Sequence, residues 1–152
     1  MTSVLLVCLG NICRSPTAAA VLRHELARAG LPDVAVDSAG TSGAHEGEGA
    51  DPRSVRHAAR RGVDLAAHRA RRVRPDDFAR FDHLWCMDDD NLAAMRARCP
   101  HEHASKLALF LGDAPVPDPY YGGPEGFDRV LDLCERAARR IIAERWAAPR
   151  RG

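Results

Sequence analysis

The chain has 152 residues, 45% of them hydrophobic and 28% charged, so it is expected to form one soluble globular domain over residues 1–152. The formal net charge of +1 excludes the strongly basic surface of a general nucleic-acid-binding domain. No apolar run approaches the ~20 residues of a membrane span, and no secretory signal is recognised. Five cysteines, an odd number, favour a reducing cytoplasm over a disulfide scaffold.

The first expected element is a buried strand over residues 3–7, followed by a helix over 16–29 that Gly30 closes. Strand and helix signals then alternate along the chain. Further strands are expected at 34–37, 83–87 and 106–110, helices at 52–61, 75–80, 88–98 and from 124 onward, and loops at 38–50 and 112–123. The alternation favours a parallel sheet with helices on both faces, in which ligands bind at the carboxyl ends of the strands.

The strongest chemical signal lies where the first strand meets the first helix. The segment Cys8–Ser15 reads Cys-Leu-Gly-Asn-Ile-Cys-Arg-Ser and stands between the apolar run 4–7 and Pro16. We expect Ser15 at the N-cap of the helix and Pro16 at its first position. The positive end of the helix dipole would then face the loop and make it a seat for a phosphate-like dianion.

Backbone N–H groups and a guanidinium would hold the anion in this loop. Glycine and asparagine tolerate the backbone angles that turn N–H groups inward. The planar guanidinium of Arg14 can bind two phosphate oxygens at once. The residues predicted to bind phosphate are Leu9, Gly10, Asn11, Ile12, Cys13 and Arg14.

Cys8, at the base of this seat, is the candidate nucleophile, because a helix N-terminus beside an arginine favours the reactive thiolate. Ser15 can donate a hydrogen bond to the sulfur and assist its departure in a second step. The leaving oxygen also needs an acid, and Asp118, on a proline-rich loop after the fourth strand, is the best candidate. These residues predict phosphoryl transfer through a phosphocysteine, with Tyr120 and Tyr121 as exposed walls of the cleft.

Plain structural interpretations of the same residues stay open at this point. Cys8 could be a small buried hydrophobe at a strand end, and Asp118 with the proline after it could form a simple turn. The segment 99–103, Cys-Pro-His-Glu-His, contains metal-ligating residue types, but no second cluster at zinc-finger spacing accompanies it. An exposed loop is therefore favoured there, and no metal is expected.

Four segments of the chain resemble the low-molecular-weight protein tyrosine phosphatases. Residues 7–16 resemble the phosphate loop of that family, and residues 37–41, Asp-Ser-Ala-Gly-Thr, resemble its second-strand signature. Residues 118–121, Asp-Pro-Tyr-Tyr, are similar to its acid loop, and residues 86–88 followed by Asn91 to its third strand. The resemblance implies a three-layer, flavodoxin-like α/β sandwich, in which the phosphate loop joins the first strand of a four-stranded parallel sheet to the first helix.

The resemblance also implies a role for each of the central residues. Cys8 would be the nucleophile, Arg14 the phosphate clamp, Asp118 the general acid and base, and Ser15 the partner of the thiolate. The second thiol, Cys13, would trap oxidised Cys8 as a reversible disulfide, although simple packing of Cys13 in the loop is equally well supported.

Supporting residues and the walls of the cleft follow from the same resemblance. Asn11 would hold the loop through a network with Ser38 and His68. The loop at 44–45 is small and polar where many relatives carry an aromatic residue, which leaves the substrate preference open. The residues expected to line the substrate cleft are Ile12, His45, Tyr120 and Tyr121.

The implied substrate is a tyrosine-phosphorylated protein, with inhibition by phosphate-like oxyanions. No cofactor, nucleic acid or membrane partner is implied, and the chain would be a monomer or weak dimer. A protein arginine phosphatase is a rival, but that subgroup is expected to carry threonine at the position of Ile12. An arsenate reductase would need further thiols to relay a disulfide outward. A phosphopeptide-binding module would not need Cys8, Ser15 and Asp118 together. A flavin-binding protein would favour a phosphate loop rich in Ser and Thr.

Overall fold

A four-stranded parallel sheet forms the centre of the computed structural model, which describes residues 2–31, 33–120 and 122–146. The strand order is β2-β1-β3-β4, which is the flavodoxin-like order without a fifth strand. The strands are β1 (Thr2–Cys8), β2 (Val34–Gly40), β3 (His83–Cys86) and β4 (Leu107–Leu109). The predicted parallel α/β architecture is thereby confirmed.

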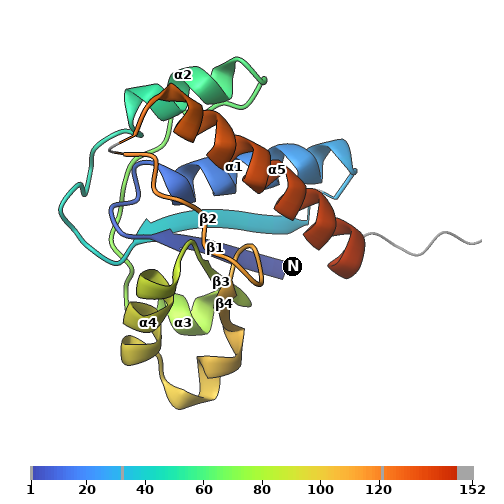
Figure 1. Ribbon diagram of the computed structural model, residues 1–152. Helices are drawn as coiled ribbons and strands as arrows, with labels where there is room; N and C mark the ends of the chain where they lie inside the picture. Colours follow the sequence, from blue (N-terminus) through green and yellow to red (C-terminus); the bar gives the residue numbers. More distant parts are fainter. Residues whose placement is uncertain (1, 32, 121, 147–152) are drawn as a thin grey trace, which may run out of the picture.

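Helices cover both faces of the sheet and complete three layers (Figure 1). The first face carries α1 (Arg14–Arg28), α2 (Pro52–Ala59) and α5 (Pro124–Arg145). The second face carries α3 (Asp77–Arg80), α4 (Asp89–Arg98) and the 3-10 helix η1 (His101–Lys106). Among the described residues, no helix is both long enough and apolar enough to cross a membrane.

Strand β1 is buried on both faces, because its side chains alternate between two hydrophobic clusters. Val4 and Leu6 pack in the cluster under α1 and α5, whereas Leu5 and Val7 pack in the cluster on the side of α3 and α4. All four side chains are 0% exposed. Each such burial stabilises the fold by about 2 kcal/mol, so β1 is a rigid support for the loop that follows it.

Several boundaries differ from those expected. Strand β2 continues to Gly40, where a loop was predicted from residue 38, because residues 38–40 pair with the last residues of β1. Helix α1 begins at Arg14 with Cys13 at the N-cap, so the prediction of Ser15 as the cap is wrong. The helix expected over 75–80 is shortened to α3, and the loop predicted around 99–103 is largely the helix η1.

Gly40 shows why the end of β2 needs small residues. A Cβ atom at this position would lie 2.7 Å from the carbonyl oxygen of Leu9 and 3.0 Å from that of Ser42. The backbone of β2 therefore passes directly beside the loop after β1. Two hydrogen bonds join the two segments, from Thr41 N to Cys8 O at 2.9 Å and from Ser42 N to Leu9 O at 3.0 Å.

Candidate active site

A pocket of ≈ 200 Å³ opens at the carboxyl ends of the strands, above the loop between β1 and α1. The loop, the segment after β2 and the segment after β4 all contribute to its walls, so residues distant in sequence meet here. The lining residues are Cys8, Leu9, Gly10, Ile12, Cys13, Arg14, Ser42, Ala44, His45, Asp118 and Tyr120. Among the residues expected in the cleft, Tyr121 lies outside the described part of the chain.

Cys8 ends β1 and places its sulfur at the base of this pocket. The thiol is held from two directions: Ser15 Oγ lies 2.9 Å from Sγ, and the N–H of Asn11 donates to Sγ at 3.3 Å. Only 3% of the Cys8 surface is exposed, so the atom can be reached only through the pocket. The N–H of Asn11, together with the Ser15 hydroxyl when it donates, can stabilise negative charge on the sulfur, which is what a thiolate nucleophile or a departing thiolate requires.

The Ser15 hydroxyl lies inside the first turn of α1 and contacts the sulfur of Cys8 instead of capping the helix. Its Oγ also accepts a hydrogen bond from Asn11 Nδ2 at 2.8 Å, and the N-cap residue Cys13 makes no side-chain capping hydrogen bond. The N–H of Asn11, one of the six residues predicted to bind phosphate, donates to Cys8 Sγ.

Asn11 is the centre of a buried network beneath the loop. It adopts the left-handed conformation with φ 58, which asparagine tolerates better than most residues. Besides Ser15, its Nδ2 donates to Ser38 Oγ at 3.0 Å, and its Oδ1 accepts from the N–H of Arg71 at 2.9 Å. The side chain is 0% exposed and bridges α1, β2 and the chain before α3.

Replacing Asn11 with alanine is expected to lower the free energy of unfolding by about 4 kcal/mol. Three hydrogen bonds are lost at about 1 kcal/mol each, and alanine is disfavoured at this backbone angle. Denaturant unfolding measures the change. Asn11→Gly is the matched variant: it loses the same hydrogen bonds but tolerates the angle, so it should be destabilised less. Near-wild-type stability of both variants would contradict the network.

His68 supports the same loop through the backbone of Asn11. Its Nε2 donates to the carbonyl oxygen of Asn11 at 2.7 Å, because a carbonyl can only accept. Burial lowers the pKa of His68, although the hydrogen bond to this carbonyl works in the opposite direction. The structure therefore brings Ser38 and His68 to Asn11, with Ser38 at the side chain and His68 at the backbone.

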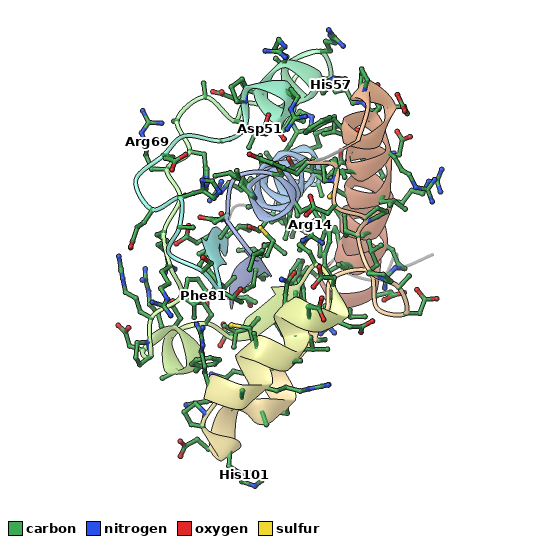
Figure 2. The ribbon with its side chains drawn as sticks, turned by 60° about the vertical axis from the view of Figure 1, so that its left-hand side comes forward. Arg14, Asp51, His57, Arg69, Phe81 and His101 are labelled. Carbon is green, nitrogen blue, oxygen red and sulfur yellow. The ribbon has the colours of Figure 1, made fainter. Side chains whose placement is uncertain are left out.

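Arg14 is the first residue of α1, and Figure 2 places it near the middle of the molecule. Its Nη1 donates to Asp88 Oδ2 at 2.7 Å and to the carbonyl oxygen of Val116 at 2.9 Å. Asp88 also caps α4 by accepting from Asn91 N, so its carboxylate has a fixed direction. Sequence reasoning assigned Asp88 no role, although an acidic residue directly after a buried strand was a usable signal for this edge.

Asp118 stands at the rim of the pocket, on the segment between β4 and α5. Its Oδ2 lies 3.9 Å from Arg14 Nη2, and its Oδ1 accepts from the N–H of Tyr120 at 3.0 Å. The side chain is 47% exposed, in contrast to the buried guanidinium. The carboxyl group therefore faces solvent and the pocket together, where a leaving oxygen or a water molecule can reach it.

The second thiol of the loop is held in its protonated form. Burial, followed by the charge of Asp51, raises the pKa of Cys13 to about 12. The Cys13 thiol donates to Asp51 Oδ2 at 3.7 Å, and the N–H of Asp51 donates to Ile12 O at 2.8 Å. Asp51, the N-cap of α2, is thus a contact of the loop that sequence reasoning missed.

The candidate metal-ligating segment 99–103 and the remaining buried thiols lie outside this pocket. Figure 2 places His101, and with it the segment 99–103, at the far end of the molecule from Asp51. No group of three His, Cys, Asp or Glu side chains in the described ranges is arranged to hold a metal ion. Cys86 and Cys134 are both 0% exposed, so neither thiol is reachable from solvent.

The sequence and the fold both match known phosphatases. The sequence profile described as "Low molecular weight phosphotyrosine protein phosphatase" matches residues 3–147. A Streptomyces coelicolor protein named "Low molecular weight protein-tyrosine-phosphatase" is 45% identical over 150 residues, covering 92% of this chain and 91% of its own length.

Two solved structures extend the comparison to the fold. A protein tyrosine phosphatase from Entamoeba histolytica, crystallised with Hepes in its active site, superposes with a TM-score of 0.91 at 38% identity, covering 95% of this chain and 96% of its own. The Vibrio vulnificus protein Wzb in complex with benzylphosphonate superposes with a TM-score of 0.85 at 29% identity, covering 94% and 98%. With the profile spanning nearly its whole length, the chain belongs to the low molecular weight phosphotyrosine protein phosphatase family.

Proposed function

We propose that this enzyme hydrolyses phosphotyrosine in proteins through a phosphocysteine intermediate. The observation that carries the proposal is the shared pocket of a buried nucleophile, a guanidinium and a rim carboxyl group, contributed by Cys8, Arg14 and Asp118. Membership of the family supports the same substrate class.

In the first step the Cys8 thiolate attacks phosphorus, the P–O bond to tyrosine breaks, and Asp118 donates its proton to the leaving oxygen. Arg14 and the loop N–H groups neutralise the charge that develops on the equatorial oxygens. In the second step Asp118 takes a proton from water, which attacks phosphorus and releases phosphate. Ser15 donates to the departing sulfur, a role supported by its 2.9 Å contact.

An aromatic substrate fits the walls of the pocket. Ile12, His45 and Tyr120 line it, and Tyr121 lies outside the described residues. The pocket also favours phosphate-like oxyanions as inhibitors, and benzylphosphonate in the Vibrio relative is consistent with this. We propose that the chain acts without metal as a monomer or weak dimer in the cytoplasm, where reducing conditions keep Cys8 active.

Cys13 is proposed as the redox partner of Cys8. Oxidation of the Cys8 thiolate by a peroxide gives a sulfenic acid. The Cys13 sulfur attacks the Cys8 sulfur, the S–O bond breaks, and the hydroxyl group leaves with the Cys13 thiol proton as water. Cys8 and Cys13 both line the same pocket, which supports formation of this disulfide.

Substrate specificity is tested with three peptides of one sequence that carry phosphotyrosine, phosphoserine or phosphoarginine. The phosphotyrosine peptide should have a kcat/KM about 100-fold above that of the phosphoserine peptide, because only the longer side chain reaches the sulfur at the base of the pocket. Turnover of 4-nitrophenyl phosphate should be unchanged by a chelator. A preference for phosphoarginine would overturn the tyrosine assignment, and loss of activity with the chelator would overturn metal independence.

A further inference from the structure

Asp118 lies on the segment that joins Val116 to the start of α5. Upstream, Val116 is tied to the sheet by its N–H, which donates to Met87 O at 2.6 Å, and by its carbonyl, which accepts from Arg14. Downstream the chain enters α5 at Pro124. The Asp118 carboxyl group is bonded to the backbone of Tyr120, so whatever fixes Tyr120 also fixes the direction of this carboxyl group.

Arg53, in the first turn of α2, packs its guanidinium over the ring of Tyr120. Its Cζ lies 5.3 Å from the centre of the Tyr120 ring and 4.7 Å from the centre of the Phe127 ring of α5. Both distances are within the range in which a guanidinium is attracted to an aromatic face. Phe127 is 3% exposed and belongs to the core, so it gives the guanidinium a fixed surface to pack on.

Asp51 holds the same guanidinium in a two-point contact. Arg53 Nε donates to Asp51 Oδ1 at 3.1 Å and Nη2 donates to Oδ2 at 2.8 Å, which is the fork geometry that fixes both position and plane. These hydrogen bonds lower the pKa of Asp51, so the carboxylate stays charged. Asp51 also forms hydrogen bonds with Ile12 and Cys13, so it connects Arg53 to the phosphate loop.

The geometry points to Arg53 as a positioning residue for the general acid. A continuous series of contacts runs from the phosphate loop through Asp51 and Arg53 to Tyr120, and then to the carboxyl group of Asp118. These contacts set the distance between Cys8, which attacks phosphorus, and Asp118, which protonates the leaving oxygen. Displacement of an acid by about 1 Å is enough to cost much of its contribution. This inference rests on the proposed function, because it assigns Arg53 a part in that reaction.

The test compares two substrates that differ in their need for an acid. Phenyl phosphate has a poor leaving group that needs protonation, whereas 4-nitrophenyl phosphate has a good one that does not. Arg53→Ala should lower kcat/KM about tenfold for phenyl phosphate and less than about twofold for 4-nitrophenyl phosphate. The ratio of the two values does not depend on the fraction of folded enzyme, so a purely structural defect leaves it unchanged.

Matched variants sharpen the result. Arg53→Lys keeps the charge but not the planar fork, so it should recover only part of the loss. Arg56→Ala removes an exposed arginine from the same helix and should leave the ratio at the wild-type value. In an Asp118→Asn background, Arg53→Ala should have no further effect on phenyl phosphate, because its partner in the reaction is gone.

Equal losses on both substrates, or an undiminished effect of Arg53→Ala in the Asp118→Asn background, would overturn the positioning role. That failure is distinct from failure of the proposed function. If Asp118→Asn itself affects both substrates equally, the acid assignment is wrong, whatever Arg53 does.

Discussion

Cys8→Ser should abolish turnover of 4-nitrophenyl phosphate and of phosphotyrosine peptides, with kcat lowered at least about 10⁴-fold. The serine hydroxyl is a far weaker nucleophile than a thiolate. Ser15 Oγ at 2.9 Å and Asn11 N at 3.3 Å both contact the sulfur, so charge on that atom can be stabilised by hydrogen bonds.

Measuring the binding of phosphate to Cys8→Ser distinguishes loss of the nucleophile from loss of the phosphate site. Cys8→Ser keeps Arg14 and the loop N–H groups, so calorimetry should still detect binding of inorganic phosphate or benzylphosphonate. Cys99→Ser is the matched control, since this thiol lies outside the pocket lining and its substitution should leave kcat unchanged. A Cys8→Ser variant with more than about 1% of wild-type activity would contradict the covalent mechanism.

Asp118→Asn should lower kcat/KM for phenyl phosphate by about 10² to 10³, within the range that a single general acid contributes. The amide keeps the size of the side chain and the acceptor for Tyr120 N, but it has no proton to give to the leaving oxygen. The value for 4-nitrophenyl phosphate should fall much less, because that leaving group departs as an anion. Steady-state kinetics with a series of aryl phosphates measures the difference.

Asp113→Asn serves as the control for charge on the same segment. Asp113 is exposed between β4 and Asp118 and is absent from the pocket lining, so its substitution should change neither substrate. If Asp118→Asn and Asp113→Asn behave alike, or if the loss in Asp118→Asn is the same for all leaving groups, another group supplies the proton.

The strand, loop and helix around Cys8 could be predicted because their signals are local. An apolar run, a turn with Gly10 and Asn11, and Pro16 near the helix start lie within a few residues of one another. The helix cap was mispredicted for a reason that is not local. The Ser15 hydroxyl is a good cap in isolation, but in the fold it contacts Cys8 and Asn11, and α1 starts at Arg14 instead.

The contacts that orient the site residues could not be predicted in the same way. Asp88 meets Arg14 across 74 positions, and Asp51 meets Cys13 across 38. No periodicity or spacing in the sequence relates these pairs, because they meet only when parallel strands bring their carboxyl ends to one edge. His68 is a partial exception, since only its likeness to a family position suggested that it supports the loop.

The sequence by itself determined the alternation of strands and helices, the phosphate loop and the residue types of the site, because each is recorded in a short segment. Only the tertiary structure decided that Asp88 aims Arg14, that Asp51 and Arg53 connect the loop to Tyr120, and that Asn11 joins three elements. Hydrogen bonds and ring contacts act over a few ångströms, so they depend on which distant segments the packed sheet brings together.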